Sequence, residues 1–310
     1  MPLTLFESAK LQTGKGALYK QGVIELYAGS SDILMNLPFE SIVGGSLTYN
    51  REETMPGVGF RGINESYAPS TGVLNPLTEV LVIAGGELDV DKFIIQTRGE
   101  QQRTTQESMK LRALSLAWTR KFIKGDSMSD PREFDGIQTR ATGEQVISAG
   151  NTAGGAALSL SVLDAAYDQT YNPTCWVMSK AMARKFGAAA RDVDVSGNIG
   201  WLPNQFGRRI RSYNELPILT VDLDNDKNQI LPFTETAASG AATASSIYCL
   251  GFGPDSLTGI QNGDMMVDDL GVLQTAPIYR TRVEWYTGLA AYNGRSITRI
   301  RDIGNLPFVK

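Results

Sequence analysis

The feature that most constrains the fold is a long insertion between two strand-like segments near the start of the chain. Ser46–Arg51 alternates apolar and polar residues with the two-residue period of a strand, and the β-branched run Leu77–Ile83 indicates a second strand. About 25 residues, rich in glycine and proline, separate them. Unstructured loops longer than about 12–15 residues are uncommon in compact domains. We therefore predict a long two-stranded hairpin with an elaborate tip over residues 45–84.

Apolar side chains are scattered through the predicted tip, which argues against simple disorder. They are Phe60, Ile63, Tyr67, Val73 and Leu74. An isolated two-stranded hairpin is only marginally stable in water, so these side chains need a surface to lie on. We expect that surface to belong to another subunit, and the chain is therefore predicted to self-associate.

The composition excludes several classes of chemistry. Among 310 residues there is no histidine, so a Ser-His-Asp triad, a Cys-His pair and a His-ligated metal are impossible. Hydrophobic residues make up 42% of the chain, as in a globular protein. The net charge of −4 is too mild for a dedicated nucleic-acid-binding protein, which is usually clearly basic.

The cysteines and the N-terminal sequence indicate a reducing compartment. The two cysteines, Cys175 and Cys249, are too few for a secreted disulfide scaffold, and we expect both to be buried thiols. The first residues lack the basic and apolar regions of a signal peptide. No apolar run approaches the ~20 residues that span a bilayer, so no membrane contact is predicted.

No motif predicts a catalytic, cofactor-binding or metal-ligating residue, and no cofactor is expected. Asp222–Asn228 opens like a calcium loop, but Lys227 and Phe233 occupy the positions that require Gly and Glu, so a solvated turn is favoured over a weak cation site. No glycine-rich loop has the spacing of a phosphate cradle. Acidic groups are expected to be surface charge; they are Glu52–Glu53, Asp268–Asp269 and the cluster Asp130, Glu133 and Asp135.

Three basic clusters lack the interleaved aromatic residues typical of base stacking. They are Arg208, Arg209 and Arg211; Arg280 and Arg282; and Arg299 and Arg301. We expect salt bridges between subunits or a solvated face. The alternative is a weak contact with packaged nucleic acid.

The remaining pattern is mixed α and β. One long helix is predicted over Arg98–Lys124, about 40 Å in length. An N-terminal arm over residues 1–36, weakly helical at Ala17–Tyr27, precedes the hairpin. Shorter helices are expected at Ser161–Tyr167, with Ser161 near the N-cap, and at Ser179–Ala190. Short strands are expected at Leu216–Val221, Ile230–Phe233 and Ile247–Phe252.

The C-terminal segment carries the clearest strand signal. In Arg280–Tyr292, Val283, Trp285, Leu289 and Ala291 share one face, while arginines begin the other. The pair Asn293–Gly294 is favoured in type I′ turns. We therefore predict a closing β-hairpin in which Arg295–Ile303 returns along Arg280–Tyr292.

The order of these elements resembles that of the major capsid proteins of tailed bacteriophages, which have the HK97-type fold. Leu37–Glu40 followed by Ser46–Tyr49 resembles the entry to the extended loop (E-loop) of that family, and Arg98–Lys124 resembles its spine helix. Arg282–Tyr292 with Arg295–Ile300 resembles its closing peripheral-domain strands. The resemblance is cumulative and covers nearly the whole chain in element order.

The resemblance implies an α+β, HK97-like capsid fold and a structural protein that is not an enzyme. The family assembles as hexamers and pentamers into an icosahedral shell around double-stranded DNA, with the extended loop over a neighbouring subunit. The implied division is an N-terminal arm (1–36), an extended loop (37–93), a peripheral domain (94–185 and 277–310, with spine helix 98–124) and an axial domain (186–276).

The implied partners are other copies of the chain, a separate scaffolding protein, a portal, decoration proteins and packaged DNA through a weak non-specific contact. A separate scaffold is expected because the arm begins almost at Met1. Some family members crosslink through a lysine in the extended loop. No lysine lies between Gly45 and Asp91, so no such crosslink is expected. The protein is expected in the virion, and in the host cytoplasm during assembly.

Two other classes fit parts of the pattern. Encapsulin nanocompartments share the fold but enclose enzymes rather than DNA, so the identity of the enclosed cargo distinguishes them. A carboxylate-dependent α/β enzyme is the second alternative, and it would be a compact monomer without a projecting hairpin.

Overall fold

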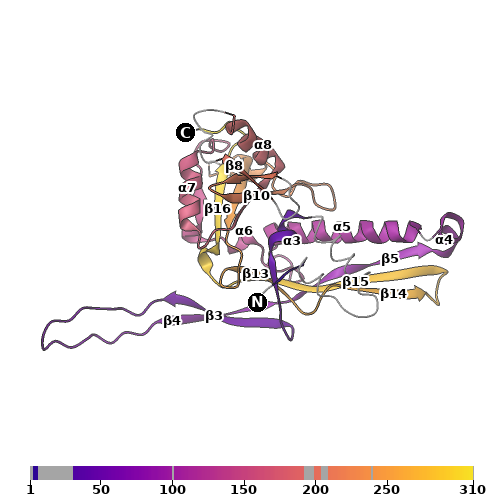
Figure 1. Ribbon diagram of the computed structural model, residues 1–310, viewed down its shortest axis with the longest axis horizontal. Helices are drawn as coiled ribbons and strands as arrows, with labels where there is room; N and C mark the ends of the chain where they lie inside the picture. The colour runs from indigo at the N-terminus through magenta and orange to yellow at the C-terminus, as the bar shows by residue number, and fades with distance from the viewer. Residues whose placement is uncertain are drawn as a thin grey trace.

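The computed structural model of the chain describes residues 3–5, 31–99, 101–191, 199–203, 209–238 and 240–309. Figure 1 shows a central body from which two extensions project in opposite directions. One is the β3–β4 hairpin. The other is a layer formed by helix α5 and the long strands β5, β14 and β15. Most of the N-terminal arm, including the predicted helix Ala17–Tyr27, lies outside the described residues.

The predicted hairpin is confirmed. β3 (Ser46–Thr54) pairs antiparallel with β4 (Val73–Val80) as a separate two-stranded sheet. The second predicted strand, Leu77–Ile83, is divided between two sheets. β4 ends at Val80, and β5 (Val82–Asp91) begins after Leu81 and pairs with β15 instead. The hairpin is therefore joined to the first sheet through residues 42–45, which follow β2, and through Leu81, which precedes β5.

The first sheet of the body carries the second extension. In its main path the strands follow the order β1 (Leu3–Thr4), β2 (Pro38–Ser41), β13 (Leu257–Gln261), β15 (Ile278–Ala291) and β14 (Met266–Val272). β5 pairs along the other side of β15. β15 is the longest of these strands and joins the body to the extension.

The second sheet lies in the body beside α7 and α8 (Figure 1). Its order is β6 (Val146–Ser148), β16 (Ile297–Ile303), β12 (Ala242–Leu250), β7 (Cys175–Ser179), β10 (Leu216–Val221), β9 (Arg209–Tyr213) and β8 (Ile199–Pro203), and β11 (Glu235–Thr236) also pairs with β12.

Three strand predictions in this region have different outcomes. The strand at Leu216–Val221 is confirmed as β10, and the strand predicted at Ile247–Phe252 begins earlier, at Ala242. The strand predicted at Ile230–Phe233 is wrong. Ile230 is buried, but its N–H closes a turn by donating to Asp222 O at 3.0 Å, so burial without strand pairing explains its apolar sequence.

The helices are α3 (Asp32–Asn36), α4 (Lys92–Arg98), α5 (Gln101–Lys124), α6 (Ile137–Arg140), α7 (Leu160–Gln169) and α8 (Lys180–Ala189), with 3₁₀ turns at η1 (Gly143–Gln145) and η3 (Gly294–Ser296). The long helix is confirmed, but its predicted start is wrong. Arg98 ends α4, because the chain turns at Gly99, whose φ of +86° suits glycine and breaks the helical path.

The N-caps of two shorter helices are Ser159 and Ser179. α7 is capped by Ser159, whose hydroxyl accepts from the backbone N–H of Val162, so the predicted cap at Ser161 is wrong by two residues. α8 is capped by Ser179, which accepts from the backbone N–H of Met182 at 3.2 Å. The predicted helix over Ser179–Ala190 is therefore confirmed.

The predicted C-terminal hairpin is wrong, although both of its strands exist. β15 belongs to the first sheet and β16 to the second. Asn293 has φ −112° and ψ 126°, which is extended rather than the left-handed conformation of a type I′ turn. Its side chain accepts from Arg295 N at 2.9 Å and opens the 3₁₀ turn η3. This segment therefore crosses from one sheet to the other.

Two buried clusters hold the body together. The first contains an aromatic group in which the ring centroids of Phe39 and Trp285 are 5.3 Å apart and those of Trp118 and Trp285 are 5.9 Å apart. The second centres on Trp176, whose ring meets Tyr213 edge-on at 5.9 Å. Offset and edge-on pairs of this kind add to the burial of apolar area.

The sheets divide the chain differently from the implied domain boundaries. β13 and β14 lie within the segment 186–276 but pair with β15 in the first sheet. β7 and β16 lie outside that segment but pair with β12 in the second sheet. The axial and peripheral segments therefore exchange strands.

The two cysteines are buried and unpaired, as predicted. Cys175 belongs to the first cluster and Cys249 to the second, although their strands are adjacent. Burial raises the pKa of both thiols, that of Cys249 to about 12. Both cysteines are therefore neutral core residues.

Candidate subunit-contact surface

The tip of the β3–β4 hairpin presents apolar side chains to solvent. Every residue from Met55 to Gly72 is exposed, and the hairpin projects far from the body (Figure 1). Phe60 is 105% exposed, Ile63 94% and Val58 89%. Soluble monomers rarely expose apolar side chains together in this way, and such patches mark interaction sites. We refer to residues 55–72 as the hairpin tip.

Local contacts shape the hairpin tip without covering its apolar residues. Asn64 has φ +68° and forms a turn in which the Glu65 side chain accepts from Gly62 N at 2.8 Å. The Arg61 guanidinium donates to Glu65 O at 3.1 Å and lies 5.2 Å from the Tyr67 ring centroid. The tip therefore has a defined backbone turn beside exposed apolar groups.

An ion pair joins the base of the hairpin to the body. Glu79, on β4, accepts two hydrogen bonds from Arg140 at the end of α6, with Nη1–Oε1 at 2.6 Å and Nη2–Oε2 at 2.7 Å. Arg140 Nη2 also donates to Leu289 O at 2.9 Å, and Nε donates to Asp135 O at 2.8 Å. Arg140 therefore links the hairpin to β15 and to the loop that follows α5.

Two tyrosines extend this attachment. Tyr49, on β3, donates to Ala291 O at 3.0 Å and lies against Tyr292 with ring centroids 4.9 Å apart. Tyr292 in turn donates to Glu40 Oε2 at 2.8 Å. Burial and the carboxylate of Glu79 raise the pKa of Tyr49, and burial and Glu40 raise that of Tyr292, so both phenols stay protonated as donors.

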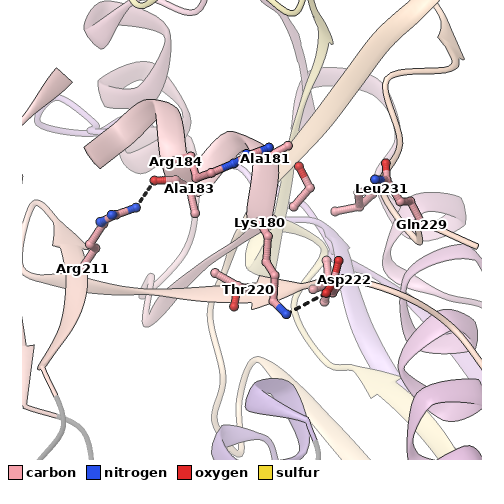
Figure 2. A pocket seen from close by; sticks show the side chains of 11 residues that line it. Lys180, Ala181, Ala183, Arg184, Arg211, Thr220, Asp222, Gln229 and Leu231 are labelled. Carbon is pink, nitrogen blue, oxygen red and sulfur yellow. Dashed lines mark hydrogen bonds and ion pairs between the residues drawn. The ribbon is translucent and has the colours of Figure 1, made fainter. Parts of the chain in front are cut away.

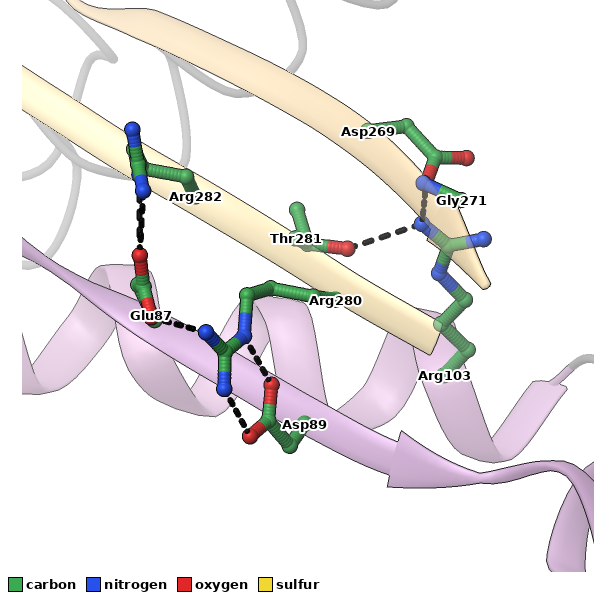
Figure 3. A network of polar contacts seen from close by, with 8 residues as sticks. All are labelled: Glu87, Asp89, Arg103, Asp269, Gly271, Arg280, Thr281 and Arg282. Atoms are coloured by element: carbon green, nitrogen blue, oxygen red, sulfur yellow. Dashed lines mark hydrogen bonds and ion pairs between the residues drawn. The ribbon is translucent and has the colours of Figure 1, made fainter. Parts of the chain in front are cut away.

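The second extension carries a ladder of charged side chains on one face of its sheet (Figure 3). Arg280 binds Asp89 through Nε–Oδ1 at 2.7 Å and Glu87 through Nη1–Oε2 at 2.8 Å. Arg282 also binds Glu87. The hydrogen bond from Arg280 lowers the pKa of Asp89. This basic cluster therefore forms its salt bridges within the subunit rather than between subunits, on a face where its side chains stay partly exposed, as predicted for a solvated face.

Three arginines of the other basic clusters also bind partners in their own chain, while Arg209 is exposed. Arg299 binds Glu235 at 2.9 Å, and Arg301 binds Asp302 at 3.1 Å. Arg211 donates to Ala183 O and lies over the exposed Trp201 ring at 5.6 Å. Arg208 lies outside the described residues.

The acidic motifs serve structural roles. In the loop after β10, Asp224 is buried and accepts from the backbone N–H groups of Asp226 and Asn228, as well as from Arg120 at 2.8 Å. The predicted turn is therefore confirmed. Of the other carboxylates, Asp269 binds Arg103, Glu133 binds Lys121, and Asp135 accepts from Ser127 N. The described residues contain no group of three or more ligand side chains placed to hold a metal.

A pocket of about 460 Å³ lies between the start of α8 and the end of β10 (Figure 2). Lys180 Nζ binds Asp222 Oδ2 at 2.7 Å across its mouth, and both side chains are largely exposed. Figure 2 shows Arg211 turned toward α8 rather than toward this pair. An exposed ion pair of this kind has no desolvated group to activate.

The sequence predicts the hairpin tip but not the side chains that attach the hairpin to the body. Arg140 and Glu79 are 61 residues apart, and neither belongs to a motif. Tyr49 lies in β3 and Tyr292 directly after β15, and neither stands out in the sequence. Only the fold brings these four side chains together.

Comparison with solved structures places the fold among shell proteins. The chain is similar to the holo-SrpI encapsulin complex from Synechococcus elongatus PCC 7942, with 13% identity, a TM-score of 0.64 and coverage of 90% of this chain and 89% of that one. It is similar to the capsid of a native GTA particle, with 14% identity, a TM-score of 0.60 and coverage of 89% and 91%. It is also similar to Mycobacterium phage Bobi, with 12% identity, a TM-score of 0.61 and coverage of 87% and 89%. These likenesses confirm the predicted fold class.

Sequence comparison supplies the family. No curated protein sequence matches the chain. Among the helices in the described part of the chain, none combines the length and apolar character needed to cross a bilayer. The family profile of the major capsid protein GP7 matches residues 15–171, about half of the chain. The chain therefore belongs to the major capsid protein GP7 family, and it is a structural component of a phage capsid rather than an enzyme.

Proposed function

We propose that the protein forms hexameric and pentameric rings that close into an icosahedral shell around double-stranded DNA. The observation that carries this proposal is the exposed hairpin tip. When two different surfaces of identical subunits contact each other, the contact generates a ring if the rotation from each subunit to the next adds up to a full turn. The hairpin tip is one such surface, and a neighbouring copy in the same ring supplies the other.

The ion pair at the hairpin base supports this role. A projecting two-stranded hairpin gains little stability from its own pairing. The bonds from Arg140 to Glu79 and Leu289 O hold its direction relative to the body before any neighbour is bound. A tip that is already oriented loses less conformational freedom on assembly, which favours association.

We further propose the functional division implied by the family: an arm (1–36), an extended loop (37–93), a peripheral part (94–185 and 277–310) and an axial part (186–276). Because the last two parts exchange strands, each of them contributes to the sheet of the other. Scaffolding, portal and decoration proteins would be its other partners, and assembly would take place in the host cytoplasm before the shell becomes part of the virion.

Assembly of tip variants tests the proposal. The double substitution Phe60→Ser and Ile63→Ser removes apolar side chains that are almost fully exposed in their own subunit, so the subunit should stay folded but fail to form rings or shells. The control is Phe60→Leu with Ile63→Leu, which keeps the tip apolar and should assemble. Electron microscopy and light scattering measure the products. Shells of normal yield from the serine variant would refute the role of the tip.

The encapsulin alternative has a specific observation in its favour, the similarity to an encapsulin shell at a TM-score of 0.64. The two functions differ in what the shell encloses. The two functions are distinguished by purifying the particles from infected cells and analysing the nucleic acid and protein that they contain. Double-stranded DNA inside the shell supports a capsid, whereas an enclosed enzyme without DNA would support a nanocompartment.

A further inference from the structure

The second extension is electrically polarised across its thickness. It consists of a helical layer (α4 and α5) packed on a sheet (β5, β14 and β15), as Figure 1 shows. The helical segment 92–124 contains eight basic and two acidic residues, a net charge of +6, whereas the whole chain has a net charge of −4. The helical layer therefore carries a net positive charge in a chain whose net charge is negative.

The opposite face of the sheet is acidic. Residues that lie directly across from each other in paired strands share a face. Arg282 lies across from Glu87 and Asp268, and Arg280 lies across from Asp89. With Glu284, which shares the alternation of Arg280 and Arg282, this face carries four carboxylates against two arginines. Figure 3 shows Arg282 engaged by Glu87, and Arg280 engaged by Glu87 and Asp89.

Contacts of α5 show which side of the helix meets the sheet. Arg103 donates to Thr281 Oγ1 at 2.8 Å and binds Asp269 at 2.6 Å, so its side of the helix faces β14 and β15. Arg112 follows nine residues later, which is two and a half turns and therefore the opposite side of the helix. Arg112 is exposed.

Among the exposed residues that the structure describes in α4 and the first half of α5, none is a carboxylate; Arg112 lies in a pocket that Asp222 and Asp224 also line, without an ion pair to either. The exposed residues in α4 and the first half of α5 are basic, apolar or uncharged polar; they are Lys92, Phe93, Ile94, Gln96, Thr97, Arg98, Gln101, Thr104, Thr105, Gln106, Met109 and Arg112. In the described part of the chain, Lys92, Arg98 and Arg112 form no ion pair. Glu107 is the acidic residue that the structure describes within these two helices, and it binds Arg103.

We propose that the outward side of α4 and α5, marked by Lys92, Arg98 and Arg112, faces the interior of the shell and contacts the phosphate backbone of packaged DNA. Arginine, lysine, glutamine and threonine side chains are the usual partners of phosphate oxygens, and such contacts carry no sequence preference. The acidic face of the sheet then faces outward, where it would not attract the polyanion. This inference rests on the proposed shell function.

The first experiment measures binding of a short fluorescent DNA duplex to the unassembled full-length subunit across a range of salt concentrations. For the wild type, affinity should fall steeply with salt because phosphate contacts release counterions. The triple variant Lys92→Gln, Arg98→Gln and Arg112→Gln should have a salt slope smaller by about 1 for each phosphate contact removed. The control, Arg132→Gln, Arg184→Gln and Arg191→Gln, removes equal charge from exposed positions elsewhere and should keep the wild-type slope.

The second experiment tests orientation with nuclease. DNA that is added before the wild type assembles should be enclosed and protected from the nuclease. DNA that is added to closed shells should stay outside and be digested. Equal salt slopes for the triple variant and the wild type, or an equal loss in the control, would overturn the contact. DNA bound to the outside of closed shells would overturn the inward orientation. Failure of assembly itself is read separately by microscopy and would count against the shell function, not against the DNA contact.

Discussion

The aromatic ring of Phe39 covers Gly259 so closely that a Cβ atom on that glycine would lie 2.4 Å from the ring carbon Cε1. The two residues are paired in parallel register between β2 and β13. Phe39 also packs on Trp285 and Trp118 in the first core cluster. The absence of a side chain at Gly259 therefore makes room for the aromatic group that joins β2, β15 and α5.

We predict that Gly259→Ala lowers the stability of the subunit by about 1–3 kcal/mol, because overpacking forces the surrounding rings and strands to shift. Thermal unfolding of the unassembled subunit measures the effect. The control is Gly59→Ala in the hairpin tip, where nothing lies within 4 Å of the added Cβ and φ is not positive. An unchanged melting temperature for Gly259→Ala would contradict the observed packing.

The attachment of the hairpin gives a second prediction. Arg140→Ala leaves the partly buried Glu79 carboxylate without its partner and should cost about 2–4 kcal/mol, as for other shielded charge pairs. The same substitution should also raise the rate of backbone hydrogen exchange in β3 and β4. Lys180→Ala breaks an exposed ion pair with Asp222 and should cost less than about 1 kcal/mol. Equal effects of the two substitutions would show that the hairpin base is not held by Arg140.

The buried thiols give a prediction about pH. Because burial raises the pKa of Cys175 and Cys249 above their value in the unfolded chain, the folded state keeps protons that the unfolded state releases. Their contribution to stability is complete below about pH 8.5, the ordinary thiol pKa, and is lost progressively as the pH rises toward 12. A Cys175→Ala, Cys249→Ala variant should therefore lose less stability than the wild type over that range, measured by denaturant unfolding.

Thiol labelling checks the same burial independently. At neutral pH the native subunit should react with a maleimide only as fast as it unfolds, whereas the denatured chain should take up two labels. Rapid labelling of the native subunit would contradict the buried positions of both cysteines. If the positions hold, a single cysteine introduced at Phe60 would report on the hairpin tip alone.

The sequence was most informative where the signal is local. The alternation in Ser46–Arg51, the length of the insertion and the apolar stripe of α5 each arise from residues close together in the chain, and each predicted element is present. The tip residues were recognisable because apolar side chains in a glycine-rich loop have no neighbours that could bury them.

The sequence was misleading where pairing is decided by distant residues. Asn293–Gly294 has the composition of a hairpin turn, but β15 finds better partners in β5, β13 and β14, and β16 pairs with β12 and β6. The pattern at Arg280 and Arg282 shows two arginines on one face, yet their carboxylate partners come from a strand about 190 residues earlier. Local patterns do not encode such partners.

The most direct test of the central claim is a cryo-electron microscopy reconstruction of the assembled particle, read at the hairpin tip. We predict that Phe60 and Ile63 of each subunit are buried against a neighbouring copy in the same ring. A reconstruction in which these side chains remain in solvent, or fold back onto their own subunit, would contradict the account.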